Sequence, residues 1–337
     1  MALKGGAAMR NVLVAYDGSV GAKAALEDLK RNRAGLPKEA EVVVLCIADV
    51  WTASRFASFG AYGLDAEPVT EAQLHAIEEA EHAALKAARQ VALKASEELH
   101  TERPGWEVRA ESCADAPAWG IVKRAEEWKA DLIVMGSHGR SAVGRFMLGS
   151  VSQVVVREAP CAVRVVRGRI GERDAPACLI IGFDGSPDAE AAVQAVAERV
   201  WSPGSTSRLV TAIDGRLSTA VSLRRGIEAR ESGKPTWMHR MIEDPIERLR
   251  ATGLSVTPVV KRGDPRTVLI EEAKRWDADG LFVGARGLRG IKRFLLGSVS
   301  TAVAMHAPCP VEVVRPVPSG NRQGHVGQQR AVQAATA

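Results

Sequence analysis

The chain has 337 residues, more than the roughly 100–200 that a single α/β core usually needs, so its length favours two domains. Hydrophobic residues make up 46% and charged residues 25%, which is typical of a globular protein and excludes a collagen, a coiled coil or a chain disordered throughout. The formal charge of +5 comes from scattered residues and only 4% of residues are aromatic, so the basic and aromatic clusters of a nucleic-acid-binding protein are missing.

The first half of the chain predicts alternating strands and helices. Short β-branched runs, most of them apolar enough for a sheet covered on both faces, predict strands at 12–16, 41–47, 106–110, 131–135 and 162–166. Helical patterns fill the gaps at 20–31, 71–99, 117–128 and 150–158. Residues 51–70 combine small and aromatic side chains and predict a surface excursion, placed as a flap over the cleft of the first domain.

The second half predicts the same alternation. Its strands are expected at 178–183, 207–213, 255–260, 280–283 and 311–314, and its helices near 187–200, 236–251, 265–276 and 298–306. Pro245 predicts a kink or a split in the second of these helices, and Gly253 suits its end. Strands that alternate with helices predict right-handed crossovers, so each half is expected to form a doubly wound parallel α/β sheet.

The two halves are copies of one another. Residues 131–139 (DLIVMGSHG) are answered by 279–287 (DGLFVGARG), and 145–152 (RFMLGSVS) by 293–300 (RFLLGSVS), at one offset of 148 residues (284 − 136). Near the start of each copy, Asp17-Gly-Ser matches Asp184-Gly-Ser at an offset of 167 (184 − 17). We therefore expect a first domain at 1–172, a second at 173–316, and a disordered tail at 317–337, where the composition turns to Gly, Gln, Ala and Ser.

Hydropathy and cysteine usage indicate the cellular compartment in which the protein is expected to function. No apolar run approaches the roughly 18 residues needed to cross a bilayer, and residues 1–10 lack the apolar core of a signal peptide, so we expect a cytoplasmic protein without membrane contact. The five cysteines are odd in number and lack CxxC spacing, which predicts reduced thiols and neither disulfides nor a metal cluster. Cys161 and Cys309, which precede the fifth strand of each half, are expected to be core thiols and not redox sensors.

Each half contains the spacing Gly-x2-Gly-x9-Gly-Ser after its fourth strand. Glycines there would let the backbone adopt unusual torsions and approach a ligand closely, and the third glycine and the serine open a helix whose N-terminus attracts phosphate. The serine is expected to cap this helix or to donate to the ligand, and a nearby arginine would offset phosphate charge. The residues concerned are Gly136, Gly139, Arg145, Gly149 and Ser150 in the first half, and Gly284, Gly287, Arg293, Gly297 and Ser298 in the second.

An aspartate follows the first strand of each half. In an open α/β sheet the ligand lies beyond the carboxyl ends of the strands at the switch point, so strands one and four as neighbours would bring Asp17 to the Gly136 loop, and Asp184 to its twin. Each aspartate could accept from a ribose hydroxyl or hold a phosphate-bound Mg²⁺. The alternative is a turn-forming role in Asp-Gly. His138 in the loop is interpreted as a solvated polar residue, because no nucleophile or metal partner accompanies it.

With these motifs the chain resembles a tandem universal stress protein from about Arg10 to Arg315. The glycine element and the strand-one Asp-Gly-Ser are similar to those of the family's ATP-binding subgroup. The resemblance implies five-stranded parallel sheets of order 3-2-1-4-5, adenine against the end of strand two, and an apolar residue beside the first glycine. The residues implied are Ile47 and Met135 in the first half and Ala212 and Val283 in the second. It also implies pairing through fifth strands, either within the chain as a pseudo-dimer or between two chains as a homodimer.

The motifs favour binding over catalysis. The chain has neither a Walker A element nor a GxGxxG sequence, and no general base can be identified, so we expect an ATP-binding stress-response sensor or regulator with slow or absent turnover and no catalytic residues. One alternative is a slow ATPase or phosphoryl- or adenylyl-transferring enzyme that uses Mg²⁺. The other is a nucleotide-free scaffold for a protein partner that the sequence does not identify. Because the excursion at 51–70 could cover or block the first cleft, the sequence leaves open whether both sites bind nucleotide.

Overall fold

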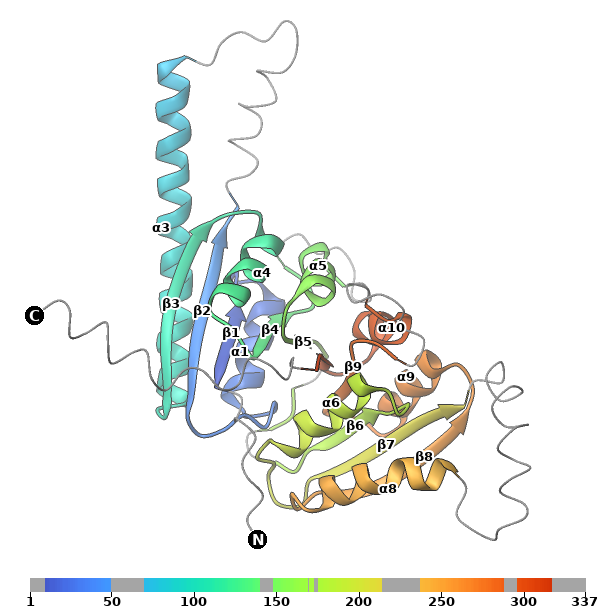
Figure 1. Ribbon diagram of the computed structural model, residues 1–337. Coiled ribbons are helices and arrows are strands. Elements are labelled where there is room, and N and C mark those ends of the chain that lie inside the picture. Colours follow the sequence, from blue (N-terminus) through green and yellow to red (C-terminus); the bar gives the residue numbers. More distant parts are fainter. Residues whose placement is uncertain are drawn as a thin grey trace, which may run out of the picture.

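Two α/β halves share one sheet in the computed structural model of the chain (Figure 1). The predicted excursion at 51–70, except for Thr70, and the predicted tail at 317–337 lie outside the residues that the structure describes. Those described are 10–49, 70–139, 148–168, 170–172, 175–213, 237–287 and 296–316.

The first half has the predicted parallel order, 3-2-1-4-5. Its strands are β1 (Asn11–Ala15), β2 (Ala40–Ala48), β3 (Trp106–Ala114), β4 (Leu132–Gly136) and β5 (Ala162–Val166). Its helices are α1 (Val20–Lys30), α3 (Glu71–Glu102), α4 (Pro117–Glu127) and α5 (Ser150–Glu158). Each predicted strand and helix is confirmed, with ends that differ by a few residues.

The second half repeats this order as β8-β7-β6-β9-β10. Its strands are β6 (Cys178–Gly182), β7 (Thr206–Ile213), β8 (Ser255–Arg262), β9 (Gly280–Gly284) and β10 (Val311–Val314), and its helices are α6 (Pro187–Ala197), α8 (Trp237–Arg250), α9 (Pro265–Arg275) and α10 (Ser298–His306). The predicted split at Pro245 is wrong, because α8 runs through this residue as one helix. Gly253, with a φ of 88°, lies just beyond its end as expected.

The halves join through their fifth strands, as the resemblance implied. Strands β5 and β10 pair antiparallel and complete a ten-stranded sheet, so the tandem domains form an internal pseudo-dimer. Two equivalent arginines brace this junction. Arg315, after β10, donates to the carbonyl of Arg157 at the end of α5 (3.2 Å) and to that of Cys161 just before β5 (3.1 Å), while Arg167, after β5, donates to the Met305 carbonyl of α10. A cation at a helix C-terminus is favourable, so each half stabilises a helix of the other.

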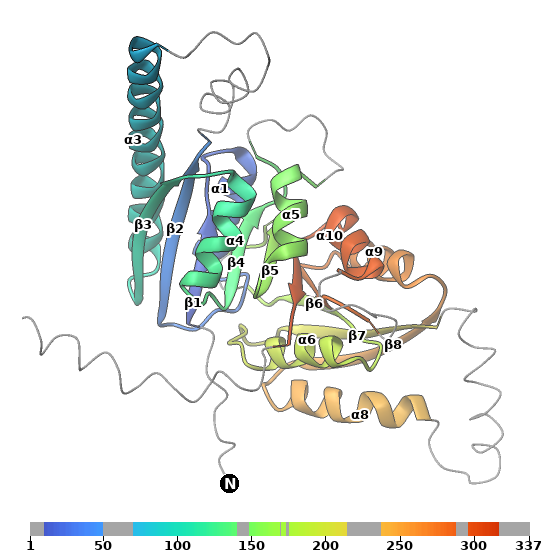
Figure 2. The same cartoon turned by 45° about the horizontal axis from the view of Figure 1, so that its top comes forward.

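Helices cover both faces of the sheet, and its inner strands, such as β4 and β5, are buried on both sides. Helices α4, α5, α9 and α10 pack on one face in a core cluster that spans both halves. On the other face, α1 and α3 cover the first half, and α6 and α8 cover the second (Figures 1 and 2). Along β1, Leu13 belongs to the shared cluster, whereas Val12 and Val14 belong to the cluster under α1 and α3.

Helix α3 extends well beyond the sheet (Figure 2). It begins at a capping box in which Thr70 accepts from the Gln73 amide at 3.3 Å and the Gln73 side chain accepts in return at 2.9 Å. Its buried residues lie between Ala88 and Leu99, while Leu74 near its start is half exposed. Across the described residues, no helix combines the length and the apolar character needed to span a membrane.

Candidate functional site

The carboxyl ends of β1 and β4 come together in the first half, as expected. These strands are parallel neighbours in which Ala15 pairs with Met135, so Asp17 lies beside the loop after β4. A Cβ atom built on Gly139 would lie 3.0 Å from the Asp17 Oδ2 atom. The second half repeats this contact, because a Cβ on Gly287 would lie 2.6 Å from Asp184 Oδ2. The carboxylate oxygen of each half therefore occupies the space beside the second motif glycine that a side chain there would need.

Both aspartates also form the turn that leads into the next helix. The Ser19 amide donates to Asp17 Oδ1 at 3.0 Å, and the Ser186 amide donates to Asp184 Oδ1 at 3.0 Å. The glycine between aspartate and serine has a φ of 78° in the first half and 79° in the second. The turn-forming role is thus confirmed, and it leaves the second oxygen of each carboxylate facing the glycine loop.

The expectation that the motif glycines adopt unusual torsions is wrong. None of the six has a positive φ. The first glycine is instead required by packing within the chain, because a Cβ on Gly136 would lie 2.2 Å from the carbonyl carbon of Gly21 in α1. A Cβ on Gly284 would lie 2.5 Å from the carbonyl carbon of Asp188 in α6. These glycines let a helix start directly against the end of a strand.

The third glycine, and not the serine, is the N-cap of the following helix. Gly149 precedes α5 and Gly297 precedes α10, and neither helix has a side-chain capping bond. Ser150 and Ser298 are the first helical residues and are exposed, so the expected capping role is wrong for them. Their hydroxyls stand at the positive end of the helix dipole, where an anion is favourable.

Two buried serines that the motif analysis missed hold the loops to these helices. Ser152 donates to the Gly136 carbonyl at 3.0 Å, and Ser300 donates to the Ala285 carbonyl at 2.8 Å. Both belong to the repeated Gly-Ser-Val-Ser sequence, two residues after the serines that were singled out. The sequence signal for them was that the last serine of Gly-Ser-Val-Ser occurs in both halves.

The remaining predicted residues lie at the strand ends or outside the described chain. Ile47, near the end of β2, and Ala212, near the end of β7, are partly exposed. Met135 and Val283 are 4% exposed and pack in the shared core cluster, so their side chains lie beneath the loops. Arg145 and Arg293 lie outside the residues that the structure describes.

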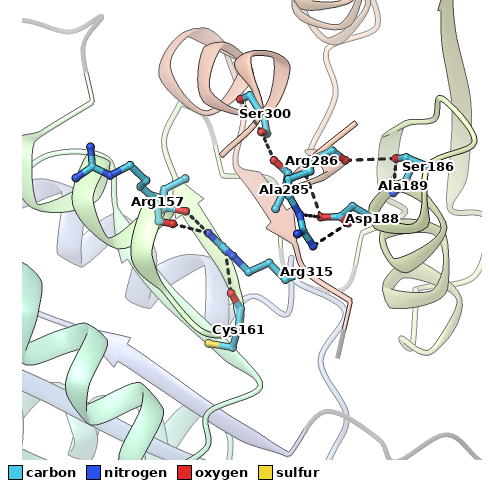
Figure 3. Close-up of polar contacts among 11 residues, drawn as sticks. Arg157, Cys161, Ser186, Asp188, Ala189, Ala285, Arg286, Ser300 and Arg315 are labelled. Atoms are coloured by element: carbon cyan, nitrogen blue, oxygen red, sulfur yellow. Dashed lines mark hydrogen bonds and ion pairs between the residues drawn. The ribbon is translucent and has the colours of Figure 1, made fainter. Parts of the chain in front are cut away.

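The two loops differ at one position, which holds His138 in the first half and Arg286 in the second. In the second half the buried carboxylate of Asp188 accepts from the Arg286 amide at 3.1 Å and from its guanidinium at 3.0 and 3.2 Å (Figure 3). The first half has Gly21 at the position of Asp188 and makes no such ion pair. A Cβ there would lie 2.3 Å from the His138 carbonyl oxygen. The second loop is therefore fixed by an internal carboxylate, whereas the first is packed directly on α1.

His138 is less solvated than the sequence suggested. Its Nδ1 lies 2.9 Å from the Ser137 hydroxyl, and its Nε2 is buried. Burial, together with the neighbouring charge of Arg167, lowers the pKa of His138. The imidazole is accordingly neutral near pH 7, and its buried Nε2 is poorly placed to exchange protons with a ligand in solution.

Cys46 and Cys309 are buried, as expected for core thiols, whereas Cys113, Cys161 and Cys178 are partly exposed. All five lie in the described residues and none forms a disulfide. Burial raises the pKa of Cys161 to about 12, and the pKa of Cys309 likewise to about 12. Such thiols stay protonated, which argues against redox sensing at these positions. Where the structure describes the chain, it contains no group of three or more metal-ligating side chains.

Comparisons with known proteins agree with this architecture. A model of the universal stress protein family matches residues 9–167 and 179–315. A universal stress protein of Mycobacterium tuberculosis is 31% identical over 222 residues, which cover 62% of this chain and 69% of that protein.

Solved structures of other proteins were also found to match this chain. A universal stress protein from Archaeoglobus fulgidus matches with a TM-score of 0.60 at 20% identity, over 91% of this chain and 98% of that chain, which shows a shared fold. A universal stress protein family protein from Arabidopsis thaliana, solved with AMP bound, matches 43% of this chain and 98% of its own at 20% identity and a TM-score of 0.31. The AMP is a property of that protein.

Proposed function

Because this chain belongs to the universal stress protein family, as a tandem of two of its domains, we propose that it binds adenine nucleotide, with ATP as the first candidate. Binding would take place at the glycine loop of each half. The nucleotide would change the contacts of the chain with a partner, so that the protein acts as a sensor or regulator in a stress response.

One observation carries the proposal: the same carboxylate approaches the same glycine in both halves. Oδ2 of Asp17 and of Asp184 lies 3.0 and 2.6 Å from the Cβ position of the second motif glycine. A side chain at Gly139 or Gly287 would have to push this carboxylate away from the loop. Two copies that differ in most other residues share this contact, and beside each of them a helix N-terminus begins at a serine.

The arrangement supplies a group for each part of a nucleotide. A ribose hydroxyl would donate to Asp17, the phosphates would lie against the exposed N-terminus of α5 at Gly149 and Ser150, and the adenine would contact Ile47 at the end of β2. In the second half Asp184, Ser298 and Ala212 would take these roles. Arg145 and Arg293, which the sequence places in the same loops, would offset phosphate charge.

Magnesium fits the site as a companion of the nucleotide. Mg²⁺ is commonly held by one or two carboxylates together with substrate phosphates and water, and each loop offers one aspartate. Asp17 or Asp184 would then hold the ion through water or directly. The metal would supply charge neutralisation to the phosphates.

We propose binding without efficient turnover. The imidazole in the first loop is His138, whose pKa is lowered by burial and whose Nε2 is buried, and its counterpart in the second loop is the ion-paired Arg286. Neither residue suits the task of taking a proton from an attacking water.

Isothermal titration of the purified chain with ATP tests the proposal. We expect two sites per chain, and we expect Gly139→Leu or Gly287→Leu each to remove one of them or to weaken it by at least about tenfold, or about 1.4 kcal/mol. Gly253→Asn is the matched control, because Gly253 is far from both loops in sequence, has no atom within 4 Å of its Cβ position, and has a φ that asparagine tolerates. Absence of heat with the wild-type chain would reject the proposal.

A further inference from the structure

The two halves meet at a residue position that faces its own counterpart. Arg164 of β5 and Glu312 of β10 are equivalent residues of the two copies, 148 apart, and the antiparallel register pairs them directly. The pseudo-two-fold axis therefore passes between these two side chains. Any dimer built in this way from two identical halves would place two identical residues here. This chain places opposite charges.

Each half brings its own ion pair to the axis, and the two pairs have opposite polarity. In the first half, Arg164 donates to Asp28 of α1 at 2.7 and 2.8 Å. In the second half, Arg199 donates to Glu312. The side chains of Asp28, Arg164 and Glu312 are 0% exposed and that of Arg199 is 3% exposed. The first half thus presents its base at the axis, and the second half presents its acid.

Across the axis the four charges alternate in sign. Nη1 of Arg164 lies 3.8 Å from Oε2 of Glu312, which is too long for a hydrogen bond, so the attraction between the halves at this point is one of charge. Two first halves would instead set arginine against arginine, and two second halves glutamate against glutamate. Like charges opposite one another in a sheet are unfavourable, and burial without compensation makes them costly.

Two further contacts between the halves have no counterpart at the equivalent positions. Arg33 of the first half pairs with Asp279 of the second at 2.7 Å, whereas the residue equivalent to Arg33 is Val200, which cannot form the reverse ion pair. Arg199 of the second half donates to the Ala34 carbonyl of the first at 2.7 Å. The surfaces of the two halves are complementary to each other and not to themselves.

We propose that the strand-five surface is a partner filter: it accepts the second half of the same chain and rejects an identical half from a second copy. It equally rejects the fifth strand of any universal stress protein that carries a base at the position of Glu312. The fifth strand, through which family members are expected to pair, is therefore already paired within this chain. This inference does not depend on nucleotide binding.

Charge reversal in full-length chains tests the filter. Arg164→Glu and Glu312→Arg are each expected to place like charges at the axis and to lower the melting temperature by about 10 °C. Produced together with different tags, the two variants are expected to form a complex of one chain of each kind. In that complex the unsubstituted halves restore the native pair, and the substituted halves face each other with opposite charges. The like-charge contacts of the substituted residues with Asp28 and Arg199 persist, so the mixed complex is expected to melt below the wild-type chain. Two differently tagged wild-type chains, the control, are expected to stay separate.

Native mass spectrometry and thermal melting distinguish the outcomes. A mixed complex that melts higher than either variant alone supports the filter, and so does solubility that returns only on co-production. The milder Glu312→Gln, which keeps the side-chain shape, is expected to lower the melting temperature by less than Glu312→Arg. The proposal would be overturned if both charge-reversal variants had the melting temperature of the wild-type chain. It would also be overturned if the mixed complex did not form, or if either variant alone formed homodimers.

Discussion

The first and second halves of the chain have the same strand order but opposite charges at two pairs of equivalent positions. Arg124 on α4 forms a two-bond ion pair with Glu111 of β3, at 2.6 and 2.8 Å. The equivalent of Arg124 is Glu272 on α9, which accepts instead from Lys261, Arg208 and Arg275. The same reversal occurs at the axis, with Arg164 in one half and Glu312 in the other.

This comparison distinguishes the residues that the fold requires in both halves from those that it allows to differ. Close packing demands a glycine at the end of the fourth strand, and both halves have one, because any Cβ there would meet the backbone of a helix. A buried charge demands only a partner, and the partner can come from either element. Charges have therefore diverged between the halves in compensated pairs, while the glycines have not changed.

The largest expected effect follows from removing one member of a buried pair. Asp28→Ala would leave Arg164 buried without its carboxylate, and we expect the free energy of unfolding to fall by about 4 kcal/mol. The equivalent position of the second half is naturally Ala195, where the arrangement of charges differs. Urea unfolding measures the effect. The neighbouring Glu27→Ala, which removes two partly exposed ion pairs, with Lys30 and Arg31, should cost less than about 1 kcal/mol, and equal effects would contradict the account.

Gly136→Ala should have the next largest effect, a loss of about 3 kcal/mol, because the added methyl group would meet the Gly21 carbonyl carbon at 2.2 Å. Gly149→Ala in the same loop meets its nearest atom at 3.4 Å and should change stability by less than about 1 kcal/mol. Similar unfolding midpoints for the two variants would show that helix–strand packing does not explain the first glycine.

Asp188→Gly gives the second loop the residue that the first loop has. We expect a loss of about 2 kcal/mol, because Arg286 loses a buried acceptor while it is itself partly exposed. The double variant Asp188→Gly with Arg286→His should recover part of this loss. Thermal melting of the single and double variants checks the pair. A double variant that is less stable than the single one would refute the idea that the two residues act together.

The smallest expected effect concerns pH. Burial alone raises the pKa of Glu272, but hydrogen bonds from Lys261, Arg275 and Arg208 outweigh it and lower the pKa below its usual value of 4.5. A carboxylate with a lowered folded-state pKa stabilises the protein above about pH 4.5, and this stability is lost as the pH falls through the folded-state value. Glu272→Gln should therefore shrink the fall in melting temperature between pH 6 and pH 3 by about 2 °C. An unchanged difference would mean that Glu272 is not involved.

The sequence was sufficient for the fold because its signals are local and occur twice. Strands such as β1 and β6 are short apolar runs, and each is followed by an Asp-Gly-Ser turn that caps the next helix. The family resemblance supplied the strand order and the pairing of β5 with β10, both of which the structure confirms. Within the site, the strand order predicted that Asp17 lies beside the loop after β4, whereas its contact with Gly139 comes from the structure.

The contacts that the sequence did not predict join residues far apart in the chain. The first glycine of the motif packs on Gly21, 115 positions earlier (136 − 21), so its packing role cannot be distinguished from a ligand role within the motif. Arg286 and Asp188 are separated by 98 residues. Each is an ordinary charged residue in its own segment, and only the folded sheet brings them together. Arg164 and Glu312 are similar, because their pairing depends on the register at the axis.

Native mass spectrometry of the purified chain with ATP is the most direct test of the central claim, that both glycine loops bind nucleotide. The account predicts up to two nucleotides per wild-type chain, one after either Gly139→Leu or Gly287→Leu, and none after both substitutions together. A wild-type chain that retains no nucleotide, or a double variant that still retains two, would contradict it.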